Sequence, residues 1–288
     1  MSGADPEKVE IRPLALEDIG EAMRLKSAAG WNQTGSDWDR LLKLEPGGCF
    51  AATVCGMVVG TTTTTTYGRG LAWVGMVLVS RDFRRRGIAT KLVRAALGWL
   101  SESGVSAVKL DATPEGAHVY EGLGFEAESR IERWSGVARP SAVADRSVGE
   151  VSDPSTLFAL DRRVFGADRS PLLSALCADA AVSPLASVTP GGSVRGYVLT
   201  RSGSEAFYVG PLVAEDVGVA ASLLDGALGN LAGRRVFVDL NTTFEGGAEE
   251  LASRGFVRQR VLIRMRYGGR SAAVTSPSVF AIAGPEYG

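Results

Sequence analysis

The clearest pattern of apolar positions lies between residues 71 and 100. A run without charged residues, Leu71 to Val79, fits a buried strand and ends at a short basic turn. After the turn, apolar residues recur at spacings of three and four, the period of one helix face. They are Ile88, Leu92 and Ala96, followed on the adjoining stripe by Ala89, Val93, Leu97 and Leu100. The pattern predicts a strand, a loop and a helix in direct succession.

The loop has the residues of an anion site. A helix that begins directly after a turn leaves its first backbone N–H groups unpaired, and Gly87 and Ala89 are small enough for a ligand to approach them. The three arginines at 84–86 add positive charge, and the helix dipole contributes about 0.3 to 1 kcal/mol towards a bound anion. A pyrophosphate fits such a site. The alternative is that the arginines are only a solvated surface run.

Weaker patterns predict the elements before this unit. A strand is expected at 9–14, a helix at 16–29, a second short helix capped by Ser36, and a hairpin of 49–54 with 57–67. The second arm of the hairpin contains six successive threonines, Thr61 to Thr66, whose β-branching suits a strand. We expect their hydroxyls to face solvent and neighbouring strands alternately.

A second chemical motif follows the predicted strand 105–110. It runs from Asp111 through Thr113 and Tyr120 to Gly124-Phe125. Pro114 stands where helices commonly begin, and Gly124 stands just past the expected end. The segment is therefore predicted to be a short helix that carries Tyr120.

The second half of the chain repeats this plan faintly. Helices are predicted at 153–165 and 217–231, and strands at 194–200, 206–213 and 236–239. The turn that corresponds to the arginine loop is acidic, with Glu215 and Asp216, and Leu251 stands at the position of Tyr120. Acidic groups repel phosphates, so this copy is expected to have lost the anion site. We predict domains at 1–138 and 151–288, with a linker at 139–150.

Composition limits the classes of function. The 288 residues suit two domains, and 45% hydrophobic with 22% charged residues is typical of soluble globular protein. A net charge of −1 argues against a nucleic-acid partner. A metal site is not expected, because the three cysteines lack metal-ligand spacing and His118 is the single histidine. A membrane partner is not expected either, because no apolar run reaches the length of a membrane span. With no signal pattern at the start, a cytoplasmic location is expected.

Both motifs resemble those of the GNAT acetyltransferases. Arg84-x-x-Gly87-x-Ala89 is similar to the (Gln/Arg)-x-x-Gly-x-(Gly/Ala) loop of that family, and Tyr120 stands four residues before Gly124-Phe125, as in its second signature. The resemblance implies an α/β (α+β) fold of two tandem GNAT-like domains, each with a mixed, mostly antiparallel central sheet flanked by helices. It also implies acetyl-coenzyme A as cofactor. The implied cofactor-binding residues are Val77, Leu78, Val79, Arg84, Arg85, Arg86, Gly87, Ile88, Ala89, Thr90 and Thr113, the last standing where the family usually has asparagine.

The resemblance further implies an N-acetyltransferase in which the amine attacks the thioester directly and coenzyme A leaves. Tyr120 would protonate the departing thiolate. Asp111 is a candidate base, together with Glu115, a relayed water and the C-terminal carboxylate of Gly288. Trp31 and Trp38 would line the acceptor cleft. The C-terminal half, a degenerate GNAT-like domain, would shape the acceptor site.

Other interpretations stay open at the level of sequence. The protein could be a non-catalytic acetyl-coenzyme A sensor or an interaction module, or it could use a longer acyl-coenzyme A. The acceptor could be a small-molecule or a peptide amine, and both a monomer and a homodimer are compatible with the sequence. We expect one cofactor site per chain, because only the first half has the arginine loop.

Overall fold

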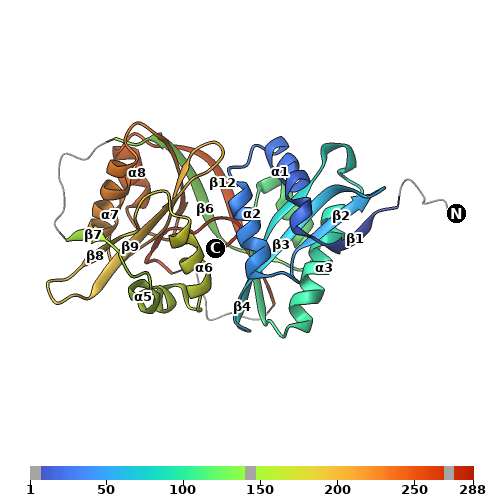
Figure 1. Ribbon diagram of the computed structural model, residues 1–288, viewed down its shortest axis with the longest axis horizontal. Helices are drawn as coiled ribbons and strands as arrows, with labels where there is room; N and C mark the ends of the chain where they lie inside the picture. The colour runs from blue at the N-terminus through green and yellow to red at the C-terminus, as the bar shows by residue number, and fades with distance from the viewer. Residues whose placement is uncertain (1–7, 140–146, 269–275) are drawn as a thin grey trace.

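The computed structural model of the chain describes residues 8–139, 147–268 and 276–288. Two lobes lie side by side along the long axis, the first drawn blue to green and the second mostly yellow to red (Figure 1). Within the described residues, thirteen strands form one sheet that continues through both lobes. The strand pairs β4–β5 and β10–β11 are parallel and the other pairs are antiparallel, so the expected mostly antiparallel α/β fold is confirmed. None of the described helices is long and apolar enough to cross a membrane.

The first half follows the predicted order of elements. They are β1 (Glu10–Pro13), η1 (Leu16–Asp18), α1 (Ile19–Ala28), α2 (Gly35–Leu44), β2 (Phe50–Val54), β3 (Met57–Tyr67), β4 (Leu71–Val79), η2 (Arg81–Phe83), α3 (Ile88–Glu102), β5 (Ala107–Ala112), α4 (Pro114–Glu121) and β6 (Glu126–Val137). The predicted apolar face of α3 is buried at Leu92, Ala96 and Leu100. The cap of α2 is Thr34 rather than Ser36, because Thr34 and Asp37 form a capping box.

In the structure, the second half repeats the order of elements of the first half more clearly than the sequence pattern indicated. Its elements are β7 (Val148–Glu150), α5 (Ser155–Phe165), α6 (Ser170–Ala178), β8 (Leu185–Val188), β9 (Val194–Arg201), β10 (Phe207–Ala214), α7 (Val217–Asn230), β11 (Arg235–Asn241), α8 (Gly247–Ser253), β12 (Val257–Gly268) and β13 (Val279–Ala281). Residues 140–146 of the predicted linker lie outside the described residues. The last three linker positions form β7, which pairs with β8.

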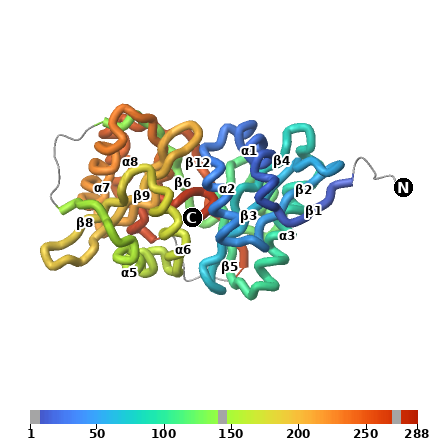
Figure 2. The backbone as a smooth tube through the Cα atoms, in the orientation of Figure 1, coloured from blue at the N-terminus to red at the C-terminus, as the bar shows by residue number. Residues whose placement is uncertain are grey.

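The two halves exchange strands where they meet. The sheet order there is β5-β12-β6-β11, so β12 lies between β5 and β6, while β6 lies between β12 and β11. β12 pairs with β5 from Ile263 opposite Ala112 to Gly268 opposite Ala107. The green β6 and the red β12 pass between the lobes in Figures 1 and 2. Each half therefore completes its sheet with a strand of the other.

The threonine run lies deeper than the sequence suggested. Thr61 to Thr65 are all buried, so the expectation that alternate hydroxyls face solvent is wrong. β3 is an interior strand that contacts α1 and α2 as well as α3, and it has no solvent face. Some of the hydroxyls donate hydrogen bonds to nearby carbonyl groups. Thr61 Oγ1 donates to the Met76 carbonyl at 2.8 Å, and Thr64 Oγ1 donates to the Gly48 carbonyl at 3.0 Å.

The strand exchange predicts that the first half does not fold alone. A fragment of residues 1–138 lacks β12, which leaves the edges of β5 and β6 without their partner strand. We expect the fragment to aggregate or to lack a cooperative thermal transition, and co-expression with residues 139–288 to restore one. Size-exclusion chromatography and circular dichroism measure both. A monomeric fragment that melts at the temperature of the full chain would contradict the role given to β12.

Candidate functional site

The site begins where two parallel strands separate. β4 and β5 pair only at Ala72 with Val108 and at Trp73 with Lys109, and then diverge. In the diverging part, β4 has one residue more than β3, and Met76 takes the left-handed conformation with φ 50°. Such a bulge bends the strand and leaves backbone groups unpaired. The separation therefore exposes the end of β4 to a ligand.

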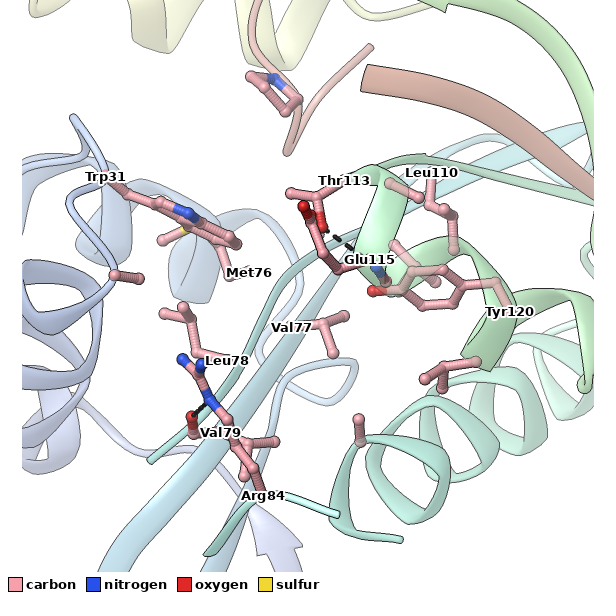
Figure 3. Close-up of a pocket in the computed structure, with 18 of the residues that line it drawn as sticks. Trp31, Met76, Val77, Leu78, Val79, Arg84, Leu110, Thr113, Glu115 and Tyr120 are labelled. Carbon is pink, nitrogen blue, oxygen red and sulfur yellow. Dashed lines mark hydrogen bonds between the residues drawn. The ribbon is translucent and has the colours of Figure 1, made fainter. Parts of the chain in front are cut away.

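A cavity of about 780 Å³ opens in this separation. It is lined by thirteen of the predicted site residues: Trp31, Val77, Leu78, Val79, Arg84, Arg85, Gly87, Ile88, Ala89, Thr90, Asp111, Thr113 and Tyr120. Figure 3 shows Trp31 across the cavity from Thr113 and Tyr120, with β4 between them and Arg84 at the end of that strand.

The beginning of α3 forms one end of the cavity. Gly87 is its N-cap in the left-handed conformation, and no side chain caps the helix. The helical hydrogen bonds begin with the Lys91 N–H, which donates to the Gly87 carbonyl, so the amides of residues 88–90 have no helical acceptor. The Arg84 Nε donates to the Val79 carbonyl at 3.2 Å, and no described carboxylate pairs with Arg84 or Arg85. This end of the cavity is suited to an anion.

Tyr120 lies on the opposite wall. The N-cap of its helix α4 is Thr113, whose Oγ1 accepts the Gly116 N–H at 3.2 Å. The ring packs edge-on against Phe125, with centroids 5.9 Å apart. The hydroxyl points into the cavity toward β4 (Figure 3). Burial raises the pKa of Tyr120 above its ordinary value, so the phenol stays protonated at neutral pH.

The second half has no equivalent of this arrangement among its described residues. At the start of α7, the Asp216 side chain accepts the Val219 N–H at 2.9 Å and so occupies the helix terminus. Arg195 donates to the same carboxylate at 2.9 Å. Leu251, at the position of Tyr120, is fully buried.

Comparisons with known proteins agree with this geometry. A model described as "Acetyltransferase (GNAT) family" matches residues 18–125, and one described as "Acetyltransferase (GNAT) domain" matches residues 157–281. The chain belongs to the GNAT family and carries two GNAT domains in tandem. Acyl transfer from acyl-coenzyme A to an acceptor is the chemistry of this family.

Relatives and solved structures extend the likeness over the whole chain. An uncharacterized N-acetyltransferase of Bacillus subtilis, YitH, is 28% identical over 75% of this chain and 76% of its own. Holothin acyltransferase of a Pseudoalteromonas species is 24% identical over 96% of this chain and 94% of its own. A putative acetyltransferase from Pyrococcus horikoshii has a TM-score of 0.85 at 24% identity, covering 100% and 99% of the two chains. A tandem GNAT protein from the clavulanic acid pathway has a TM-score of 0.62 at 17% identity, covering 91% and 98%.

Two residues predicted for the site do not line the cavity of this tandem GNAT protein. Trp38 is fully buried in the core beneath α2, packed with Leu41, so the expectation that it lines the acceptor cleft is not met. Arg86 is exposed, and its guanidinium lies 5.3 Å from the centroid of the Phe83 ring instead of in the cavity. No residue of α2 is among those that line the cavity, whereas Arg84 and Arg85, next to Arg86, are.

The candidate bases differ sharply in their surroundings. Asp111 is buried and accepts two bonds from Arg264 of β12, at 2.8 and 2.9 Å. Burial raises the pKa of Asp111, and the Arg264 charge opposes that shift. An oxygen of the Gly288 carboxylate accepts from Arg169 at 3.1 Å, and Gly288 does not line the cavity. Glu115 is exposed in the cavity wall without a hydrogen bond to any described residue.

The second GNAT domain contributes cavity residues that sequence reasoning missed. They are Arg260 and Leu262 of β12, with Pro285 and Glu286 of the segment after β13. Glu286 is buried, and its carboxylate accepts from Arg201 at 3.0 Å and from Gln33 at 2.8 Å. Burial raises the pKa of Glu286, while the Arg201 charge opposes the shift. No spacing in the sequence signals these residues. Arg260 and Leu262 reach the first domain through the strand exchange, and Pro285 and Glu286 through hydrogen bonds with Trp73 and Gln33.

Arg260 differs from the other buried cations of the protein. It is half-buried, its Nε is inaccessible to solvent, and that Nε has no hydrogen-bond partner. Desolvation, followed by repulsion from Arg133, lowers the pKa of Arg260 to about 10. The side chain nevertheless stays charged at neutral pH.

The close packing of Glu286 on β4 predicts the effect of a single methyl group. A Cβ on Gly75 would lie 2.7 Å from the Glu286 Cα, which is backbone and cannot rotate aside. We expect Gly75→Ala to lower the free energy of unfolding by about 1 to 3 kcal/mol. Urea denaturation followed by circular dichroism measures the change.

The matched control is Gly98→Ala, at an exposed position inside α3. Its Cβ would meet no atom within 4 Å, so the substitution should be neutral or stabilising by up to about 1 kcal/mol. A Gly75→Ala variant as stable as the parent would show that the 285–286 segment does not rest on β4.

Proposed function

We propose that the protein is an N-acetyltransferase that moves acetyl from acetyl-coenzyme A to an amine by direct attack. The observation that carries the proposal is the placement of two features on opposite walls of one cavity. The uncapped start of α3 with Arg84 and Arg85 lies at one end, and the Tyr120 hydroxyl faces β4 across the separation from β5. Membership of the GNAT family supports acyl transfer. That the acyl group is acetyl and that the acceptor is an amine are part of our proposal.

The cofactor would lie along the separated part of β4. Its pyrophosphate would accept hydrogen bonds from the amides of residues 88–90 and from Arg84 and Arg85. The pantetheine arm would follow the backbone of residues 77–79 beyond the bulge at Met76. The Thr113 hydroxyl accepts the Gly116 N–H and keeps its own proton, which it can donate to the cofactor.

In the reaction, the neutral amine attacks the carbonyl carbon of the thioester. The new C–N bond forms, the C–S bond breaks, and Tyr120 gives its proton to the departing thiolate. The amine must also lose a proton. Arg264 holds both oxygens of Asp111, so we do not assign that step to Asp111. We assign that step to Glu115, acting directly or through a water. Its carboxylate lies in the cavity wall, and no described residue hydrogen-bonds to it.

The cofactor contacts predict a charge-dependent loss of affinity. A charge-assisted hydrogen bond contributes about 1.5 to 3 kcal/mol, so Arg84→Ala with Arg85→Ala should raise the Kd of acetyl-coenzyme A at least roughly tenfold. Isothermal titration measures the Kd and should give one site per parent chain. Arg86→Ala is the control, because its side chain lies outside the cavity. Unchanged affinity in the double variant would mean that the arginines are surface residues.

The role of Tyr120 predicts a loss of turnover without a loss of binding. Tyr120→Phe keeps the ring against Phe125 and removes the hydroxyl. General acid catalysis contributes about 100- to 10,000-fold, so kcat should fall at least 100-fold while the Kd of acetyl-coenzyme A changes little. Release of free thiol measures kcat.

Tyr267→Phe is the matched control, because Tyr267 packs on the same Phe125 ring from β12, at 5.3 Å between centroids, and does not line the cavity. Parental turnover in Tyr120→Phe would remove this residue from the mechanism. A parent that binds acetyl-coenzyme A but releases no thiol with any amine would favour a sensor over an enzyme.

A further inference from the structure

The acceptor end of the cavity contains a cation without a counter-ion. Arg260 lies on the same strand face as Leu262, because alternate residues of a strand share a face. Leu262 packs in the core with Trp38 and Trp73, whereas its neighbour Ile263 packs toward the core that contains α3 residues. Arg260 is therefore on the sheet face opposite α3, away from the Arg84 loop.

The carboxylates near Arg260 are all committed to other partners. Asp239 accepts from Arg133 at 2.7 and 2.5 Å, and also from the Tyr208 hydroxyl at 3.2 Å. Glu286 is held by Arg201 and Gln33. Arg133, directly opposite Arg260 on β6, carries the same charge. Among the described residues, Arg260 therefore lines the cavity without a salt bridge.

An uncompensated, partly desolvated guanidinium costs stability unless something pairs with it. Arg260 also presents a planar set of donors that matches a carboxylate. The surrounding wall is apolar at Trp31, Leu262 and Pro285. We propose that Arg260 binds the carboxylate of the acceptor, so that the substrate is an amine that also carries an acid group, such as an amino acid. This inference rests on the proposed function and names the substrate class of that same site.

The test compares the standard amino acids with their carboxamides as acceptors, with acetyl-coenzyme A and thiol release as readout. We expect kcat/KM to be higher for the acid of each active pair. In Arg260→Gln, kcat/KM for the acid should fall roughly 10- to 150-fold, the equivalent of one charge-assisted hydrogen bond, while that for the carboxamide changes little. Arg260→Lys keeps the charge but loses the planar set of donors. Its kcat/KM for the acid should lie between those of the parent and of Arg260→Gln.

Arg258→Gln is the control on the same strand. Arg258 is exposed, pairs with Glu132 at 2.9 Å and does not line the cavity, so kcat/KM should stay parental. Equal turnover of acids and carboxamides by the parent, or an Arg260→Gln variant with the parental preference, would overturn the proposal.

A binding measurement separates this inference from the proposed function. N-acetyl amino acids, which the reaction would produce, should raise the Tm of the parent more than their amides do, and Arg260→Gln should abolish the difference. Without ligand, Arg260→Gln should melt at or above the parental Tm, because it removes an unpaired charge opposite Arg133. If no amine supports thiol release, the proposed function fails, and the Tm difference still decides whether Arg260 binds an acid. Equal shifts for acids and amides would overturn the inference.

Discussion

The exchange of β6 and β12 is the constraint on which the rest of the structure depends. An interior strand position must be filled, because unpaired backbone groups are costly when buried. Each half leaves that position to the other, so neither sheet is complete alone. The same exchange brings Arg264 to Asp111 and Arg260 to the cavity. The second GNAT domain is thus part of the wall of the cavity, while the Asp216 carboxylate occupies the corresponding helix terminus of that domain.

Buried charges from both halves meet along this junction. Arg133 of the first half pairs with Asp239 of the second, Arg264 of the second pairs with Asp111 of the first, and Gln33 donates to Glu286. Buried pairs add little net stability, but a pair that loses one partner leaves an uncompensated charge, which costs about 3 to 5 kcal/mol. The Arg264–Asp111 pair penalises a shift in the register of β12 against β5, and the Arg133–Asp239 pair penalises a shift of β6 against β11.

The sequence predicted the residues at the α3 end of the cavity well and those at the β12 end poorly. The arginine loop, the apolar period of α3 and the position of Tyr120 are local patterns, so adjacent residues were enough to identify them. Arg260 reaches the cavity through its strand pairing with Arg133, and Glu286 does so by packing on Gly75 and accepting from Gln33. These partners lie more than a hundred positions away, and no periodicity carries that information. The prediction for Trp38 was wrong for a related reason. Whether a tryptophan on a helix lines a cleft or packs in the core depends on which face of the helix the rest of the chain covers.

A structure of the protein with bound coenzyme A tests the central claim most directly, namely that the first half holds the cofactor and the second half completes the acceptor wall. The account predicts one molecule per chain between β4 and β5, with its pyrophosphate at the start of α3 and its sulfur beside the Tyr120 hydroxyl. The space between the sulfur and Arg260 would be left for the acceptor. Coenzyme A at the start of α7, or a thiol that lies away from Tyr120, would contradict it.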